Sequence, residues 1–378
     1  MTKNIIYLLI GFLLFNCQGN KTENQTDLSS EEVQEINDPE LWKSYQGSEG
    51  APEIVLISGD EEYRSEETLP QLAKILAEHH GFNCTVLFAQ DPAKPGVVNP
   101  NYANSIPGLE ALESADLMII ATRFRALPDS QMVKIDNYLK SGRPVIGLRT
   151  ATHAFNFKDS KIESGYTHYG NYHESDDEWN GGFGRLVLGE KWISHHGHHK
   201  HQSTRGIFAE DQENHAIFNG IDPGSVWGPT DVYGVRLPLS GDAVPLLLGQ
   251  VTNRKGEYDE NDVLFGMRIT DDEVAGEEEH EGKMINKNNP MMPVAWTKSY
   301  QLPNGKKGKV FATTMGSSTD MLTEGTRRMV INSVFWCLDL DVPEKANVDL
   351  IGAYEPSAYS FKEDSFWIEK KIVISEIK

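Results

Sequence analysis

The feature that most constrains the fold is a series of short segments that are apolar along their whole length and alternate with helical patterns. Strands buried on both faces must be covered by helices on both faces, as in the parallel sheets of doubly wound α/β proteins. In the first half of the chain we expect strands at 53–58, 84–89, 116–121 and 144–149, with helices before Gly81 and over 128–140. The sequence therefore predicts a large α/β unit whose ligands bind beyond the carboxyl ends of the strands.

The second half of the chain continues this series less regularly. We expect strands at 232–237, 244–248, 263–269, 293–296 and 309–314, and a helix at 324–338. Residues 152–229 are rich in Gly, His and aromatic residues and lack a regular period, which favours long loops over one end of the sheet. The acidic stretch 271–281 is interpreted as a solvated insertion, with a cation site as the alternative.

The start of the chain has the pattern of an export signal. Lys3 precedes an apolar run at residues 5–15, which is too short to span a bilayer as a helix. The run ends in Leu14-Phe15-Asn16-Cys17, which is similar to a bacterial lipobox and predicts lipidation of Cys17. A plain secretory signal with an incidental cysteine is the alternative.

These patterns divide the chain into four parts. We expect a lipoprotein signal peptide at 1–17, a polar tether at 18–51, the α/β domain at 52–340, and a C-terminal extension at 341–378 that packs on the domain. The predicted location is the bacterial cell envelope, with the protein held by its lipid and facing the periplasm or the cell surface.

The net charge restricts the partners that the protein can bind, and the cysteine content restricts the disulfides that it can form. The 35 Lys and Arg against 56 Asp and Glu give a net charge of −21. A field of this sign repels nucleic-acid phosphates and anionic lipids, so we expect no nucleic-acid partner and membrane contact only through the lipid anchor. Cys84 and Cys337 lie in apolar segments and are interpreted as core residues, with a single disulfide as the alternative.

The turn after the fourth expected strand stands where class I glutamine amidotransferases and α/β hydrolases carry a nucleophile. Here the position holds Arg149, so acyl-enzyme chemistry has no obvious start and a glutaminase is not expected. Thr150 is a poor substitute for that nucleophile, because nothing in the sequence marks a base that would activate its hydroxyl. His153 is a candidate general base, ligand or anion donor, and the structural alternative is that both Arg149 and His153 only hold loops together.

The densest cluster of potential ligands is Ser194-His195-His196-Gly197-His198-His199-Lys200-His201, which holds five of the 12 histidines. Imidazoles at such spacing can converge on Zn or a similar divalent ion, and we select His195 and His198 as the candidate metal ligands. A carboxylate to complete the site would come from Glu61, Glu62, Glu174 or Asp231. A hydrogen-bonding substrate loop or a solvated His-rich surface is the alternative.

The first loop and several aromatic residues suggest where a polar ligand would be held. Glu61, Glu62 and Arg64 follow the first expected strand at its carboxyl end, where ligand contact and helix capping are equally good explanations. Aromatic residues such as Trp192 and Tyr233, interleaved with polar ones, suit the C–H faces and hydroxyls of a sugar. The alternative for most of them is that long loops need apolar residues to pack.

Several segments together resemble the ThuA-like (trehalose-utilisation) family, a branch of the class I glutamine amidotransferase-like superfamily. The matching stretches are the first strand with Ser58-Gly59, then 142–153, 183–195, 214–217, 231–234, 293–297, 308–316, 327–328 and 332–336. The resemblance implies a flavodoxin-like sheet without the amidotransferase nucleophile and a link to carbohydrate metabolism, including keto-disaccharides. The chain departs from the family pattern at Glu61-Glu62, where many members have His, and at Gly316-Ser317, where they have Gly-His.

The leading hypothesis is an envelope lipoprotein that acts on or binds a sugar or keto-sugar derivative in a loop-built pocket. As a hydrolase, His153 or His195 would move the proton, Arg149 would steady negative charge, and Glu61 or Asp231 would orient the imidazole. The candidate substrate-binding residues are Glu61, Glu62, Arg64, Asp231, Tyr233 and Trp192. The alternatives are a non-catalytic carbohydrate- or protein-binding module and a metal-dependent hydrolase built on the His-rich loop.

Overall fold

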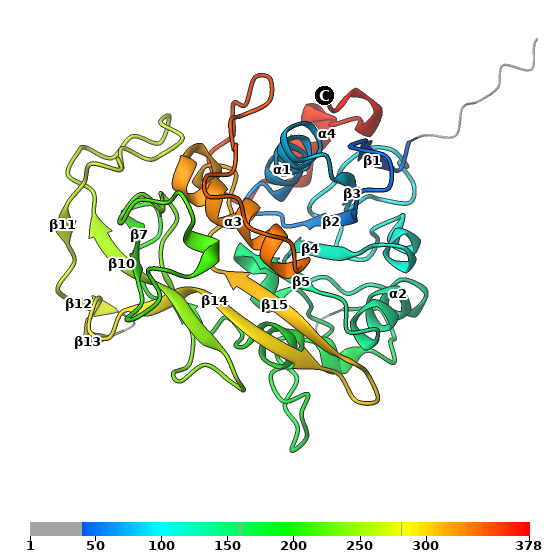
Figure 1. Cartoon of the computed structure of the whole chain (residues 1–378), viewed down its shortest axis with the longest axis horizontal. Coiled ribbons are helices and arrows are strands. Elements are labelled where there is room, and N and C mark those ends of the chain that lie inside the picture. Colours follow the sequence, from blue (N-terminus) through cyan, green and yellow to red (C-terminus); the bar gives the residue numbers. More distant parts are fainter. Residues whose placement is uncertain (1–39, 159, 281) are drawn as a thin grey trace, which may run out of the picture. The chain divides into compact units, whose positions relative to one another are not determined.

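The computed structural model of the chain describes residues 40–158, 160–280 and 282–378 (Figure 1). The predicted export signal, Cys17 and most of the predicted tether therefore lie outside the described residues. In the part that is described, no helix is both long and apolar enough to cross a membrane.

The centre of the molecule is an eleven-stranded sheet with the order β1-β3-β2-β4-β5-β15-β14-β10-β7-β8, and β11 pairs with β10. Five neighbouring strands in the order β3-β2-β4-β5-β15 are mutually parallel. Numbered along the chain, this order is 2-1-3-4-5, the flavodoxin-like arrangement. The predicted α/β, flavodoxin-like class is thus confirmed. The parallel strands are β2 (Glu53–Gly59), β3 (Asn83–Phe88), β4 (Leu117–Thr122), β5 (Val145–Leu148) and β15 (Lys307–Thr313).

Antiparallel strands extend this parallel core on both sides, so the sheet as a whole is mixed. They are β1 (Trp42–Tyr45), β7 (Gln202–Phe208), β8 (Trp227–Gly228), β10 (Val244–Asn253), β11 (Glu273–Val274) and β14 (Met292–Gln301). Two small sheets lie apart from it: β6 (Ser194–His195) with β9 (Tyr233–Gly234), and β12 (Glu277–His280) with β13 (Lys283–Asn286).

Helices cover both faces of the parallel core because successive strand residues point to opposite sides. In β2, Ile54 and Leu56 join the apolar cluster under α1 (Ser65–His80) and α3 (Glu324–Cys337), whereas Val55 and Ile57 join the cluster under α2 (Asp129–Lys140). The remaining helices are short: α4 (Asp364–Lys370), η1 (Leu109–Glu113), η2 (Arg149–His153), η3 (Thr167–Tyr169), η4 (Gly184–Leu188), η5 (Ala216–Phe218), η6 (Asp320–Leu322) and η7 (Ile374–Glu376).

Three of the sequence expectations for local structure are wrong. Residues 263–269 form turns rather than a strand, because the Asp262 side chain accepts hydrogen bonds from the N–H groups of Leu264 and Gly266. Within 232–237 only Tyr233–Gly234 pairs as a strand. The span predicted as a tether contains β1, which pairs with β3, so the sheet already begins at Trp42.

Both cysteines and the C-terminal segment belong to the folded body. Cys84 and Cys337 are buried and free, as expected for core residues. After α3 the chain returns across the molecule, and Tyr359, Trp367 and Ile374 are buried in it. The acidic stretch contains the short strands β11 and β12, and most of its described residues are exposed.

Candidate functional site

A cleft of about 350 Å³, open solvent included, lies at the carboxyl ends of the parallel strands. The loops after β2 and β4 supply part of it, and these two strands flank the point where the strand order reverses, which is where flavodoxin-like sheets bind ligands. The lining residues are Glu62, Tyr63, Arg123, Phe124, Arg149, Thr150, His153, Trp192, His195 and Tyr233. The structure thus brings the Arg149 turn and the His-rich loop to one cleft.

Arg149 stands directly after β5 with a φ of 43°, a left-handed conformation that is uncommon for a residue with a side chain. The sharp turn of a nucleophile elbow is therefore present, but it carries a guanidinium that is 2% exposed. The N–H groups of that guanidinium bind the Asp231 carboxylate (3.0 Å), the Asp231 carbonyl (2.9 Å) and the Thr314 carbonyl (2.7 Å). Both terminal nitrogens of Arg149 thus bind neighbouring groups of the protein and fix Asp231, whereas its Nε has no hydrogen-bond partner among the described residues.

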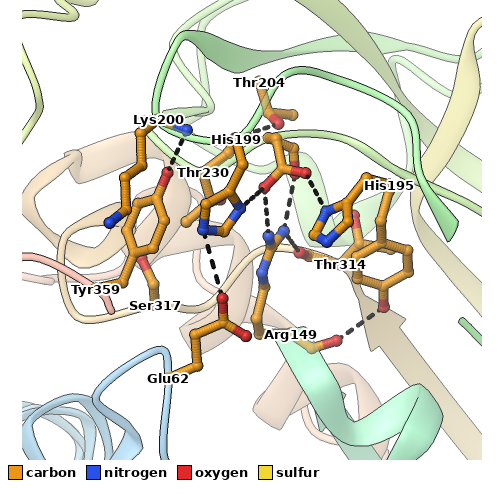
Figure 2. Close-up of polar contacts among 12 residues, drawn as sticks. Glu62, Arg149, His195, His199, Lys200, Thr204, Thr230, Thr314, Ser317 and Tyr359 are labelled. Carbon is orange, nitrogen blue, oxygen red and sulfur yellow. Dashed lines mark hydrogen bonds and ion pairs between the residues drawn. The ribbon is translucent and has the colours of Figure 1, made fainter. Parts of the chain in front are cut away.

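Asp231 is the centre of a polar network whose members His195, His199 and Arg149 are labelled in Figure 2. Its carboxylate is fully buried and lies 3.1 Å from Nδ1 of His195, 3.2 Å from Nδ1 of His199 and 3.0 Å from Arg149. Burial opposes ionisation, but the hydrogen bonds from the two imidazoles and the charge of Arg149 hold the pKa of Asp231 far below its usual range. Because an ionised carboxylate only accepts, both Nδ1 atoms must carry the hydrogen.

His195 is the histidine that Asp231 makes basic. The hydrogen bond to Asp231 raises the pKa of His195 above its ordinary value, although partial burial acts in the opposite direction. The side chain is 47% exposed and lines the cleft. With Nδ1–H held by a buried carboxylate, Nε2 offers its lone pair to a molecule in the cleft, which is the arrangement of a His–Asp general base.

His153 lines the same cleft in a different environment. Its ring packs 5.0 Å from Phe124 and 5.5 Å from Trp192, measured between ring centroids, and it is buried. Burial first, and then the positive charges of Arg123 and Arg149, hold the pKa of His153 well below its ordinary value. His153 is therefore a neutral imidazole near pH 7 and serves as a hydrogen-bonding group rather than as a stored proton.

His199 lies between the carboxyl groups of Asp231 and Glu62. Nε2 of His199 lies 3.4 Å from the Glu62 carboxyl, while its Nδ1–H points to Asp231. Two lone pairs would face each other there unless one side carries a hydrogen. Burial raises the pKa of Glu62, against the opposing charge of Arg123, so the carboxyl is a suitable carrier. The site therefore pairs a basic imidazole with a nearby acid.

The loop after β4 contributes a positive charge and an aromatic ring. The Arg123 side chain is 20% exposed, ion-pairs with Glu61 and lies 3.5 Å from Glu62. Its guanidinium also lies 4.7 Å from the centroid of the Phe124 ring, and Phe124 adopts a φ of 50°. Of the two arginines in the cleft, Arg123 is the more accessible to a bound anion or oxyanion.

Thr150 has the carboxylate partner that the sequence did not reveal. Its hydroxyl donates to Asp60 at 2.7 Å, and both side chains are buried. The second oxygen of Asp60 accepts from the N–H groups of Glu62 and Tyr63, at 2.8 and 3.0 Å. Asp60 thus shapes the β2 loop, and Thr150 helps to hold it there.

The structure separates the predicted site residues into two groups. His153, His195, Arg149, Glu62, Trp192 and Tyr233 line the cleft, and Asp231 lies directly behind it. Tyr233 is buried, and its hydroxyl donates to the Arg149 carbonyl at 2.8 Å.

The other predicted residues do not line the cleft. Glu61 is held by Arg123 and Arg125, so Asp231 and not Glu61 orients the imidazole. Arg64 is buried against Trp367, 4.8 Å from its ring, and lies 3.5 Å from Glu66.

Of the two metal ligands predicted from the sequence, His195 belongs to the candidate set in the structure and His198 does not. His198 lies 3.1 Å from Glu278, away from the cleft lining, and it is His199 that lies beside His195. One ligand atom each from His195, His199 and Asp231 lie within 4.8 Å of one another, and this donor set suits Zn. Arg149 already neutralises Asp231 at 3.0 Å, so a cation would have to displace or outcompete that contact.

Sequence reasoning missed several residues of the site: Tyr63, Arg123, Phe124 and His199. For Arg123 and Phe124 a signal was present, because they follow the expected strand at 116–121 at its carboxyl end. For the choice between His198 and His199 no signal exists in the sequence, since spacing does not fix which way an irregular loop turns its side chains.

No family model matches the chain, and no curated protein sequence matches it. A solved structure from Parabacteroides merdae, described as a ThuA-like protein, aligns with a TM-score of 0.44 and 11% sequence identity, covering 82% of this chain and 98% of that one. A second solved structure, from Bacteroides uniformis and also described as a ThuA-like protein, aligns with a TM-score of 0.41 and 15% sequence identity. The alignment covers 77% of this chain and 94% of that one. Proteins described as ThuA-like are thus among the structures to which this chain is similar, at low identity and low TM-score.

Proposed function

We propose that this protein is an enzyme that performs general acid–base chemistry on a sugar or sugar derivative, with His195 as the group that moves the proton. The observation that carries the proposal is the 3.1 Å contact between Nδ1 of a half-exposed imidazole and the fully buried Asp231 carboxylate. A buried carboxylate in this position fixes the tautomer and stabilises the imidazolium that forms when the ring takes a proton.

The surrounding groups supply the remaining parts of such a reaction. In this proposal, His195 Nε2 accepts a proton from a water or hydroxyl in the cleft, and the Glu62 carboxyl, whose pKa burial raises, gives a proton to the leaving oxygen. Arg123 offers positive charge where negative charge develops, because its side chain is 20% exposed whereas that of Arg149 is 2% exposed and binds Asp231 and Thr314. The turn after β5 offers no thiol or activated serine, so the chemistry proceeds without an acyl-enzyme at that position.

The rim of the cleft supports a sugar as the substrate class. Trp192 and Phe124 are partly exposed and line it, whereas Trp179, Phe183 and Trp227 are buried and serve packing. Partly exposed aromatic faces beside carboxyl, guanidinium and hydroxyl groups match the C–H faces and hydroxyls of a sugar ring. This agrees with what the family resemblance of the sequence implies.

The test is a turnover assay with a panel of p-nitrophenyl glycosides and their keto-sugar forms. We expect release of p-nitrophenol by the wild type and a loss of about 10²-fold or more in kcat for His195→Ala. His198→Ala is the matched control, because it removes a neighbouring imidazole of the same loop that lies outside the cleft lining. Equal activity in the wild type and His195→Ala would refute the proposal, and sugar binding without turnover would favour a binding module instead.

The cluster of His195, His199 and Asp231 favours a second candidate, a metal-dependent hydrolase. These three residues would hold a divalent ion, which would activate water in the cleft. Elemental analysis of the purified protein separates the two candidates. Stoichiometric Zn that is lost in His199→Ala would support the metal enzyme, and activity that survives exhaustive chelation would support the acid–base enzyme.

We also propose that the protein is exported and lipid-anchored at Cys17. The support is the order of charged, apolar and lipobox-like residues in the first 17 positions. The test is cell fractionation: Cys17→Ala should move the protein from the membrane fraction to the soluble one. Retention of the variant in the membrane fraction would contradict this proposal without affecting the site.

A further inference from the structure

The C-terminal segment, which follows the last helix of the α/β core, places a buried tyrosine behind the His–Asp site. The Tyr359 side chain is fully buried, and its ring stacks on Tyr63 with 5.2 Å between centroids and an angle of 27°. The edge of the His199 ring meets it at 5.0 Å and 82°. Figure 2 shows Tyr359 beside the loop that carries His199. A residue from outside the flavodoxin-like core thus contacts two parts of the site.

The hydroxyl of Tyr359 joins the two loops that meet in the network around Asp231. It accepts a hydrogen bond from the N–H of Lys200 at 3.2 Å, the residue directly after His199. It donates to the carbonyl of Pro229 at 3.3 Å, two residues before Asp231. Lys200 has a φ of 64°, a conformation that costs free energy for a residue with a side chain and that the hydrogen bond helps to hold. One O–H group therefore spans the gap between the His199 loop and the Asp231 loop.

The ring of Tyr359 reaches the network around Asp231 through Tyr63. It packs against Tyr63, and the Tyr63 ring lies 4.2 Å from the guanidinium carbon of Arg149, which binds Asp231. The backbone next to Tyr359 is attached to the same loop, since the N–H of Ser360 donates to the Glu62 carbonyl at 3.0 Å. The segment therefore contacts the loops that carry His199 and Glu62, and through Tyr63 it supports Arg149.

We propose that Tyr359 is a positioning residue of the site, which sets the distance between the His199 and Asp231 loops through its hydroxyl and supports Arg149 through Tyr63. The inference rests on the proposed function, because positioning matters only where the His–Asp pair acts. Its effect reaches the substrate through other residues, so it should change turnover more than binding. It makes the C-terminal extension a part of the catalytic unit rather than only a cover for the sheet.

The experiment compares Tyr359→Phe with Tyr300→Phe in the full chain. Both changes remove one hydroxyl from a tyrosine that is at most 2% exposed and hydrogen-bonds two backbone partners, but Tyr300 bonds the carbonyls of Leu139 and Arg143, which are not part of the site. Hydrogen exchange of the peptide around Lys200 and steady-state kinetics on the p-nitrophenyl glycoside panel are measured for each. Tyr300→Phe is the matched control, because it shows how much of each effect comes from a general loss of stability.

We expect Tyr359→Phe alone to speed amide exchange at Lys200 by about three- to tenfold, which is the loss of one net hydrogen bond. We also expect it to lower kcat by about tenfold while KM stays within about twofold. If Tyr359→Phe matches Tyr300→Phe in both measurements, the inference is wrong. If the wild type turns over no glycoside, the proposed function fails. The positioning role is tested separately by amide exchange: it is overturned if exchange at Lys200 in Tyr359→Phe is the same as in the wild type.

Discussion

His153 and His195 line the same cleft but have pKa values that shift in opposite directions. His153 follows β5 in the parallel core, is packed between aromatic rings and faces two guanidinium groups, which lowers its pKa. His195 ends the short strand β6 and meets the buried Asp231 carboxylate, which raises its pKa. The comparison shows that two residues of the same type acquire opposite pKa shifts, and that the neighbouring groups determine the direction of each shift.

Removing the charge of Asp231 should abolish the difference between the two histidines and is the largest expected effect. In Asp231→Asn the amide can no longer stabilise an imidazolium, so we expect kcat to fall by about 10³-fold or more. Arg149 would lose its buried partner, and the free energy of unfolding should drop by about 3 kcal/mol. Kinetics together with urea denaturation check both effects. A variant with near wild-type kcat would show that the His–Asp contact is structural only.

The pH dependence of the rate should report the raised pKa of His195. As a base the ring must be neutral, so kcat/KM should rise with pH and level off only above the ordinary histidine value of about 6.5. The same shift affects folding: protonated His195 stabilises the native state below that value, and the contribution is lost as pH rises through the raised pKa. A rate that levels off well below pH 6 would assign the titration to His153 instead.

Replacing His153 should have a smaller effect than replacing His195. His153→Asn keeps a neutral hydrogen-bonding group, and we expect kcat within about tenfold of the wild type, with the pH profile unchanged. The measurement is the ratio of kcat for His153→Asn and His195→Ala on the same glycoside. Should His153→Asn be the more damaging change, the roles assigned to the two histidines would have to be exchanged.

The smallest predicted effect concerns Trp192, whose ring lies near both histidines, 5.5 Å from His153 and 5.9 Å from His195 between centroids. In Trp192→Ala a sugar would lose a stacking face, so KM should rise by about three- to tenfold with little change in kcat. Trp192→Phe should recover most of the loss. An unchanged KM in Trp192→Ala would remove this ring from the substrate-binding surface.

The parallel core could be predicted from the sequence because its information is local. In β4, and in β2 from Ile54 onward, each residue is buried, and such runs, alternating with helices, admit few arrangements. The position of Arg149 at the carboxyl end of a strand follows from the same pattern. By contrast, 263–269 looked like a strand because apolar content alone does not reveal the Asp262 hydrogen bonds that turn the backbone.

The fold class and the sheet edge that carries the candidate cleft follow from local patterns in the sequence. Only the tertiary structure decided that Asp231 pairs with His195, that His199 rather than His198 lies beside it, and that Tyr359 supports the network from the far end of the chain. The physical reason is that burial patterns repeat within a few residues, whereas the contacts of an irregular loop depend on groups that are distant in sequence.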